Sequence, residues 1–389
     1  CILSQLKEAR AAPHWLTVRF RNSRYTYPIR PLLIDSMPYR HKIVPHSFTC
    51  LRSLPPVLVE SEVASHIGTH RRSPEEGSGP MIYTVTLNPA LDKTATVENL
   101  RLDSVNRISE LRVDPGGKGI NVSKVVRELG AKTVAIALLG GHTGTMLRNM
   151  LAELGIECKV LEVEGETRTN LKIKDPALKT NTDINEPGPE VTDEQLRGML
   201  DGLVGEVGSG DIVVLSGSLP RGAAADTYKV WVAALKKTGA KVYLDADGDK
   251  LVRGIEAKPD LIKPNEIELG AMMGRTLDAD EKIVEAAREL IDGGLDRVMV
   301  SMGGAGALYV ARDVTIKANP VKVPVGSTVG AGDSVVAALA YAQDKGLGLE
   351  DTMRLAMATG AANVMQSGTQ AAPRELVDSL IDKVVVTRL

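Results

Sequence analysis

The sequence has little cysteine and no long apolar run, and each scarcity excludes a class of protein. Cys1, Cys50 and Cys158 are too few and too scattered for a disulfide framework, and they lack the paired spacing of a zinc site. No run of about 18 apolar residues exists, so no transmembrane helix is expected. We expect a reducing, cytoplasmic setting, with neither a nucleic acid nor a membrane as partner.

Charge and composition change near Met81. Residues 1–80 carry 11 basic and 6 acidic side chains, which leaves 36 basic and 43 acidic side chains for residues 81–389. Five of the six histidines, both phenylalanines and nine of the twenty prolines lie before Met81. This contrast indicates that two different kinds of sequence are joined there.

Residues 1–80 show no sustained strand or helix period, and prolines interrupt their short apolar runs. We interpret them as a disordered or non-native N-terminal extension, translated upstream of a natural start at Met81. A targeting peptide and a disordered interaction arm are the alternatives.

From Met81 the pattern alternates between apolar strands and helices. Strands are expected near 81–87, 133–139, 158–163, 168–174, 211–215, 241–245, 261–263 and 297–300. Helices are expected near 120–129, 144–154, 223–237, 279–292, 332–344, 350–366 and 374–384, with a short one after 245 and another from Glu266. Strands that are apolar on both faces and separated by helices predict an α/β fold with a mainly parallel sheet.

Two segments depart from this pattern. Residues 94–113 and 168–185 alternate in polarity without an intervening helix. They predict a small β-sheet beside the main domain, which could serve as a lid.

The strongest chemical motif is Ser327-Thr328-Val329-Gly330-Ala331-Gly332-Asp333-Ser334. Three small residues precede an apolar helix, and backbone N–H groups at a helix start attract anions. Asp333 falls in the first turn, where a carboxylate can accept the proton of an attacking hydroxyl. The alternative is that Asp333 only caps the helix, and the motif alone leaves both interpretations open.

This segment resembles the signature of the ribokinase-like, PfkB family of carbohydrate kinases. The resemblance implies that Asp333 is the catalytic base and that the amides of Gly330, Ala331 and Gly332 form an anion hole. It also implies a three-layer α/β/α fold with a β-sheet lid, ATP and Mg²⁺ as cofactors, and a homodimer formed through the lid.

A second glycine motif, Asp114-Pro115-Gly116-Gly117-Lys118-Gly119-Ile120-Asn121, also opens a helix. It is not a Walker A loop, because Lys118 is followed by glycine rather than Ser or Thr. A tight turn that needs positive φ is the alternative. The motif resembles the family's sugar-site signature, which implies that Gly117 and Asn121 bind sugar hydroxyls.

The first predicted strand ends in Asn88-Pro89-Ala90-Leu91-Asp92. A carboxylate at the carboxyl end of a strand could hold two sugar hydroxyls, although a simple turn residue is the alternative. The family's phosphosugar kinases have a similar segment, which implies the sugar-binding role for Asp92.

Arg168, in Thr167-Arg168-Thr169-Asn170, and Arg107 lie in the two halves of the predicted lid. The planar guanidinium suits phosphate because it donates two parallel hydrogen bonds. An ordinary solvated arginine is the alternative. Resemblance to the phosphofructokinase branch implies that both arginines bind the phosphate of a phosphorylated sugar.

Further segments resemble the family's nucleotide site. Lys263-Pro264-Asn265-Glu266-Ile267-Glu268 resembles the Asn-x-x-Glu element, which implies that Glu268 orders Mg²⁺ through water. A capping box from Asn265 to Glu268 is compatible with that role. The residues implied to face the nucleotide are Lys263, Asn265, Ser301, Gly303, Gly306, Thr328, Gly332 and Asn363.

The resemblance covers residues 81–389, with its motifs in the expected order. It implies transfer of the γ-phosphoryl group of ATP to a ketohexose phosphate, and it is closest to the branches that act on fructose 1-phosphate and tagatose 6-phosphate. We expect fructose 1-phosphate as substrate and fructose 1,6-bisphosphate as product. Tagatose 6-phosphate and fructose 6-phosphate remain alternative substrates, and a non-catalytic sugar-phosphate-binding regulator is the alternative from another class.

Overall fold

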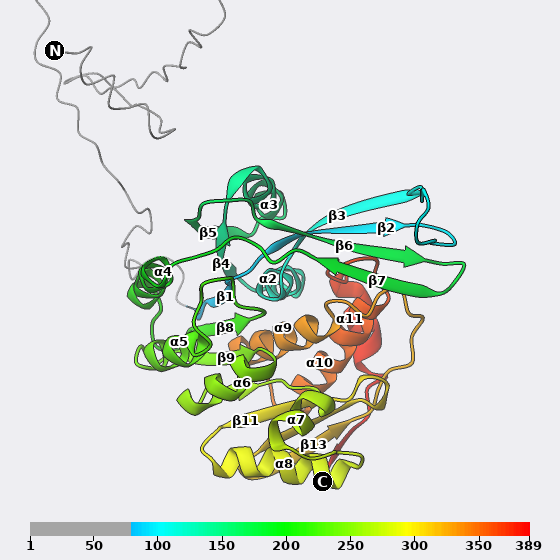
Figure 1. Cartoon of the computed structure of the whole chain (residues 1–389). Helices are drawn as coiled ribbons and strands as arrows, with labels where there is room; N and C mark the ends of the chain where they lie inside the picture. Colours follow the sequence, from blue (N-terminus) through cyan, green and yellow to red (C-terminus); the bar gives the residue numbers. More distant parts are fainter. Residues whose placement is uncertain (1–78) are drawn as a thin grey trace, which may run out of the picture. The chain divides into compact units, whose positions relative to one another are not determined.

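The computed structural model describes residues 79–389 (Figure 1). The interpretation of the N-terminal extension therefore concerns residues that lie almost entirely outside the described part. Among residues 79–389, no helix has both the length and the apolar character needed to cross a bilayer.

One large sheet forms the centre of this part of the chain. Most of its strands run parallel to one another, and the last three strands of the chain are added antiparallel at one edge. In order across the sheet, the strands are β14 (Val386–Arg388), β13 (Val314–Ala318), β12 (Ala307–Ala311), β11 (Arg297–Ser301), β10 (Leu261–Ile262), β9 (Lys241–Asp245), β8 (Ile212–Ser216), β1 (Ile82–Thr86), β4 (Thr133–Leu139) and β5 (Glu157–Glu162).

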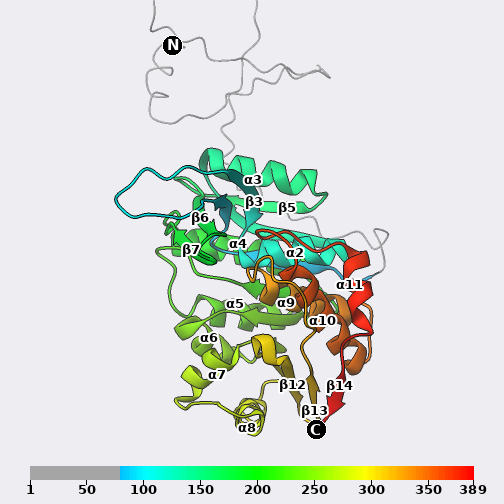
Figure 2. The same ribbon diagram turned by 90° about the vertical axis from the view of Figure 1, so that its right-hand side faces the viewer.

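Helices cover both faces of this sheet. One core holds side chains from α4 (Asp193–Glu206), α5 (Thr227–Lys236), α6 (Gly248–Gly254), α7 (Glu266–Met273) and α8 (Asp280–Asp292). Apolar side chains on the opposite face belong to α2 (Lys118–Glu128), α3 (Gly141–Glu153), α9 (Ala331–Asp344), α10 (Leu349–Val364) and α11 (Arg374–Ile381). Figure 2 shows α2, α9, α10 and α11 gathered on one side. The predicted three-layer α/β/α fold is confirmed.

The central strand β1 shows why both layers are needed. Tyr83 lies opposite Val134 and Val213 and enters one core, whereas Ile82 enters the other. All five residues of β1 are buried, because successive side chains point to opposite faces and each face is covered by helices.

A second, smaller sheet has the order β3-β2-β6-β7. Its strands are β2 (Ala90–Thr96), β3 (Glu110–Gly116), β6 (Arg168–Asp175) and β7 (Thr180–Asn185). It extends away from the large sheet next to α3 (Figure 1). The prediction of a small sheet was right, but β2 begins earlier than expected. The chain leaves β1 at Thr86 and enters β2 after only residues 87–89. Asp92 therefore lies inside β2 rather than at the end of the first strand.

The sequence interpretation missed other elements. Helix α4 was not predicted, although Thr192 and Gln195 form a capping box at its start and Asp193 and Glu194 fill its first turn. Strands β12 to β14 were also missed. The helices expected over 223–237 and 374–384 are shorter, since α5 begins at Thr227 and α11 ends at Ile381.

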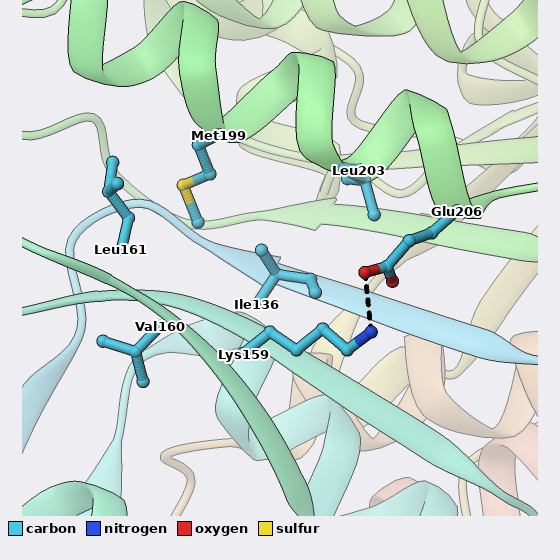
Figure 3. Close-up of a pocket in the computed structure, with 7 residues that line it drawn as sticks. All are labelled: Ile136, Lys159, Val160, Leu161, Met199, Leu203 and Glu206. Atoms are coloured by element: carbon cyan, nitrogen blue, oxygen red, sulfur yellow. Dashed lines mark hydrogen bonds and ion pairs between the residues drawn. The ribbon is translucent and has the colours of Figure 1, made fainter. Parts of the chain in front are cut away.

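Figure 3 shows how α4 packs against the edge of the large sheet. Met199 and Leu203 from α4 face Ile136 of β4 and Leu161 of β5 around a small apolar cavity. At its rim, Lys159 Nζ of β5 lies 2.6 Å from a carboxylate oxygen of Glu206. This cavity is a packing detail of the core and lies apart from the motifs that carry chemistry. The described residues also form two short 3₁₀ turns, η2 (Ile255–Ala257) and η3 (Gly303–Ala305).

Candidate active site

Asp333 is the third residue of α9, and its side chain is buried. Asn121, in the first turns of α2, donates a 2.8 Å hydrogen bond from Nδ2 to Asp333 Oδ2. Burial and, to a smaller extent, the nearby carboxylate of Asp245 raise the pKa of Asp333 to about 6, while Lys118 and Asn121 oppose the shift. The fold therefore brings the two glycine motifs together at a carboxyl group that can exchange a proton near neutral pH.

The small residues before Asp333 leave the backbone open at the start of α9. Gly330 is the N-cap and has φ 79°, a left-handed conformation that favours glycine. A Cβ on Gly332 would lie 3.3 Å from Nζ of Lys263. The N-terminus of α9 and an ammonium group thus face the same space, which suits an anion.

Asp245 is a buried carboxylate that the sequence interpretation did not single out. It ends β9, and its Oδ1 lies 3.7 Å from Lys118 Nζ and 3.5 Å from Lys263 Nζ. Both lysines lower the pKa of Asp245 against the opposing effect of burial. Asp245 therefore orients two ammonium groups beside Asp333. Its position at the carboxyl end of a parallel strand was a usable signal, because ligands of α/β sheets bind at that end.

The second glycine motif wraps around Asp92. A Cβ on Gly116 would lie 2.0 Å from Asp92 Oδ2, and a Cβ on Gly117 would lie 2.7 Å from Thr86 Cγ2. Gly117 also has φ 108°. Glycine is required at both positions by close approach, and at Gly117 by backbone conformation as well.

Asn170 of β6 donates a 2.9 Å hydrogen bond to Asp92 Oδ1. Burial raises the pKa of Asp92, while Asn170 and the charges of Lys124 and Arg168 oppose the shift. The hydrogen bond fixes one carboxylate oxygen, so the other can accept from a ligand hydroxyl. Asn170 was quoted in the Arg168 motif but was not proposed as a site residue.

Four buried side-chain oxygens around these residues have no hydrogen-bond partner: Thr86 Oγ1, Asn88 Oδ1, Asn121 Oδ1 and Asn170 Oδ1. An unpaired buried acceptor costs free energy unless a bound molecule supplies a donor. Asn170 contacts Asp92 and Asn121 contacts Asp333, so unpaired acceptors at both carboxylates suit a ligand rich in hydroxyl groups.

Arg168 begins β6 and is half-buried. Its Nη2 donates to the Asn88 carbonyl at 3.1 Å, and its Nη1 donates to the Glu186 carbonyl at 3.2 Å. The guanidinium therefore lies beside the β1–β2 connection and the sugar motif. Arg107 lies elsewhere: it is exposed in the connection between β2 and β3, at the opposite end of β2 from Asp92.

Several residues predicted to face the nucleotide or its metal lie just beyond the ends of the neighbouring strands β10 and β11. Asn265 caps α7, and the predicted capping box is present: Asn265 Oδ1 accepts from the Glu268 amide, and Glu268 Oε2 accepts from the Asn265 amide. Asn265 also bridges to Ser301 at the end of β11. The box uses one oxygen of Glu268, which leaves the second able to accept from a metal-bound water.

Residues 79–389 contain no cluster of three or more His, Cys, Asp or Glu side chains arranged to hold a metal ion. Mg²⁺ usually keeps several waters and binds phosphate oxygens of the nucleotide. A magnesium ion bound to ATP would not need such a cluster, and the free oxygen of Glu268 could accept a hydrogen bond from one of its waters.

The other predicted nucleotide residues lie in the turn after β11, in the loop before α9 and near the end of α10. Gly303 (φ 50°) and Gly306 (φ 97°) shape the exposed turn after β11. Thr328 lies in the loop before α9, and Asn363 near the end of α10 donates to the Val329 carbonyl at 3.3 Å. Asn363 thus supports the loop that carries Gly330.

Comparison with known proteins agrees with this geometry. The model of the pfkB family of carbohydrate kinases matches residues 86–375. The 1-phosphofructokinase of Bacillus subtilis is 39% identical over 309 residues, which cover 79% of this chain and 100% of that protein. The 1-phosphofructokinase of Rhodobacter capsulatus is 40% identical, with 79% and 98% covered.

The crystal structure of phosphofructokinase-2 from Escherichia coli in complex with fructose-6-phosphate superposes with a TM-score of 0.74 at 30% identity, over 78% of this chain and 99% of that chain. The likeness extends over nearly the full length of each of these proteins. This chain belongs to the pfkB family of carbohydrate kinases, and it is a sugar phosphotransferase.

Proposed function

We propose that this enzyme transfers the γ-phosphoryl group of ATP to the free primary hydroxyl of fructose 1-phosphate, which yields fructose 1,6-bisphosphate. The observation that carries the proposal is the position of Asp333, buried at the start of α9 and hydrogen-bonded to Asn121 of the glycine motif beside Asp92. The similarity to 1-phosphofructokinases supports the choice of sugar.

In this mechanism Asp333 accepts the proton of the attacking hydroxyl. Its pKa of about 6 leaves it mostly ionised at neutral pH, yet basic enough to take a proton as the new P–O bond forms. The amides of Gly330, Ala331 and Gly332 stabilise negative charge on the transferring group. Positioning and electrostatic stabilisation supply most of the catalysis in phosphoryl transfer.

Lys118 and Lys263 add positive charge beside the transferring group, and Asp245 holds both ammonium groups in place. We infer that they balance the charge that builds up on the leaving phosphate. When bound with ATP, Mg²⁺ neutralises phosphate charge, and Glu268 would orient its water shell from the start of α7.

On the sugar side, Asp92, Asn121 and the Gly117 backbone hold hydroxyl groups. Arg168 holds the phosphate that the sugar already carries, since its guanidinium now donates only to two backbone carbonyls. Arg107 is also proposed to bind the sugar phosphate. It is exposed and lies away from Asp92 of its own chain, so this contact is more easily made to a second protein molecule.

The small sheet is proposed to act as a lid that excludes water from the phosphoryl group. Its outer parts carry exposed apolar side chains, which favour the predicted homodimer formed through the lid. These side chains are Leu102, Val105, Ile108, Leu111, Leu178 and Ile184. Light scattering of Leu102→Asp and Val105→Asp tests this assembly. If the dimer forms through the lid, both variants should have a lower molecular mass in solution than the unaltered protein.

Two further proposals concern the whole chain. Residues 81–389 form the kinase domain, so a protein shortened to begin at Met81 should keep full activity. Loss of activity would count against a non-native extension. The low cysteine content supports a cytoplasmic location.

An ADP-release assay across four sugars tests the substrate. Fructose 1-phosphate should give the highest kcat/KM, ahead of fructose 6-phosphate, tagatose 6-phosphate and unphosphorylated fructose. Preference for another sugar phosphate would favour the alternative kinases, and preference for fructose itself would remove the phosphate-binding role of Arg168.

The same assay with Asp333→Asn separates a kinase from a sugar-phosphate-binding regulator. Loss of a general base typically lowers the rate by about 10²- to 10⁴-fold. A near-unchanged rate in this variant would mean that Asp333 is not the base.

A further inference from the structure

Lys124 is a buried lysine for which the mechanism above has no use. It lies on α2, one turn after Asn121, and is 6% exposed. Its Nζ donates to the Pro115 carbonyl at 2.8 Å, to the Thr369 carbonyl at 2.6 Å and to Thr369 Oγ1 at 3.3 Å. These three acceptors match the three donors of an ammonium group, which is the condition for burying such a charge.

The two segments joined by Lys124 come from distant parts of the sequence. Pro115 precedes Gly116, the residue that packs directly against the Asp92 carboxylate. It therefore belongs to the sugar side. Thr369 lies 245 positions further along the chain than Lys124, in the turn that follows α10.

The turn after α10 is connected to the anion-binding loop. The carbonyl of Val364, the last residue of α10, accepts hydrogen bonds from the amides of Gly326 and Ser327 at 2.8 and 3.0 Å. Asn363 holds the Val329 carbonyl, one residue before Gly330. Displacement of this turn would therefore be transmitted to the loop at the start of α9.

The base of the lid touches the same turn. A Cβ on Gly368 would lie 2.8 Å from Asp114 Oδ2, 3.4 Å from Arg112 Cδ and 3.4 Å from Thr94 Oγ1. Gly368 has φ 64°, so the close approach and the backbone both favour glycine. The sugar loop, the lid base and the support of the anion-binding loop thus meet around one ammonium group.

Charged groups from three elements face Lys124. They are Asp92 from β2, Asp114 and Arg112 from β3, and Asp333 from α9. Burial lowers the pKa of Lys124 to about 8, and the carboxylates oppose the shift while Arg112 adds to it. The side chain is therefore mostly charged at pH 7 and mostly neutral at pH 9.5.

We propose that Lys124 is a positioning residue that couples sugar binding to nucleotide binding by tying the turn after α10 to the sugar loop. The proposal rests on the proposed function of this site. A ligand that orders one of the two segments fixes the ammonium group, so the second ligand meets a partner segment that is already in place. The coupling is reciprocal, so either ligand can be varied to measure it.

The experiment is calorimetric titration with the sugar phosphate that the substrate panel prefers. Its Kd is measured with and without a non-hydrolysable ATP analogue and Mg²⁺, and the ratio gives the coupling factor. The unaltered enzyme should show a factor of about 5 or more at pH 7. Lys124→Met should bring the factor close to 1, Lys124→Arg should retain most of it, and Lys132→Met, which removes an exposed lysine, should leave it unchanged.

A second arm measures pH dependence and does not require Lys124→Met to fold. For the unaltered enzyme, the factor should fall between pH 7 and pH 9.5, and for Lys124→Arg it should fall less, because arginine stays charged. A factor of 1 in the unaltered enzyme, or an undiminished factor in Lys124→Met, would overturn the proposal. A different preferred sugar would overturn only the substrate assignment, whereas no phosphoryl transfer to any of the four sugars would overturn both.

Discussion

Asn121 and Asp333 are 212 positions apart in the sequence, yet the amide of one donates a 2.8 Å hydrogen bond to the carboxylate of the other. This contact joins the motif that opens α2 to the motif that opens α9. It also favours the ionised form of Asp333, against the effect of burial.

Asn121→Ala should therefore raise the pKa of Asp333 further, because the hydrogen bond that favours the carboxylate is lost. The acid limb of the kcat/KM profile, expected near pH 6 in the unaltered enzyme, should move to higher pH. A profile of initial rates from pH 5 to 9 measures this shift. An acid limb at its original pH in the variant would show that this bond does not tune Asp333.

Asp333→Asn should make the protein more stable at alkaline pH while it lowers activity strongly. The pKa of Asp333 is raised from 3.8 to about 6, so the folded state favours the protonated acid. The stabilisation from this preference is complete below the ordinary pKa and is lost as pH rises through about 6. The variant cannot ionise, so it should have the higher unfolding temperature at pH 8.

Thermal unfolding at pH 4 and pH 8 checks the sign. The advantage of Asp333→Asn should shrink toward pH 4, where the unaltered carboxyl is protonated as well. A variant that is less stable than the unaltered protein at pH 8 would contradict the inferred pKa.

Gly116→Ala should impair sugar binding much more than nucleotide binding. The added Cβ would lie 2.0 Å from Asp92 Oδ2, so either the carboxylate or the loop must move. We expect the KM for the sugar phosphate to rise by about tenfold or more, because a misplacement of about 1 Å is costly in a preorganised site.

Gly198→Ala is the matched control for that change. Gly198 lies inside α4, where an added Cβ meets no atom within 4 Å. It should leave the kinetics unaltered and stabilise the fold by about 0.5–1 kcal/mol. Equal effects of the two substitutions on the KM for the sugar would exclude a special role for Gly116.

Lys159→Met should destabilise the fold without affecting catalysis. The Glu206 side chain is 7% exposed and would lose the ammonium group 2.6 Å away (Figure 3). Because Lys159 is partly exposed, we expect a loss of about 1–2 kcal/mol in the free energy of unfolding. The double variant Lys159→Met/Glu206→Leu should recover most of it, and denaturant unfolding of the three proteins provides the measurement.

The sequence predicted the architecture well where one segment contains its own signal. Buried strands such as β1 and β4 read as apolar runs, and the helices after them follow from periodicity and glycine stops. Helix α4 had a capping box and an acidic first turn and could have been found. Strands β12 and β13 form a hairpin with only Arg312 and Asp313 between them, so their short apolar runs could also have been found, whereas β14 pairs with β13 from far along the chain.

The same distinction between local and long-range signals applies to the candidate site. Asp333, Asp92 and the glycines lie in compact motifs, and the structure places them together. Asp245 could have been found from its position at the end of β9, but its pairing with Lys118 and Lys263 depends on three elements meeting in space, so no local pattern could indicate that pairing. The connection of Lys124 to Thr369 is likewise invisible before the chain folds.

The short connection between β1 and β2 has one further consequence. Arg168 donates to the carbonyl of Asn88, which lies in the three residues that connect β1 of the large sheet to β2 of the small one. A substrate phosphate would compete with that carbonyl for the same donors. If Arg168 recognises the sugar phosphate as proposed, phosphate binding would release the carbonyl of Asn88, and the β1–β2 connection would be freed to move as the sugar binds.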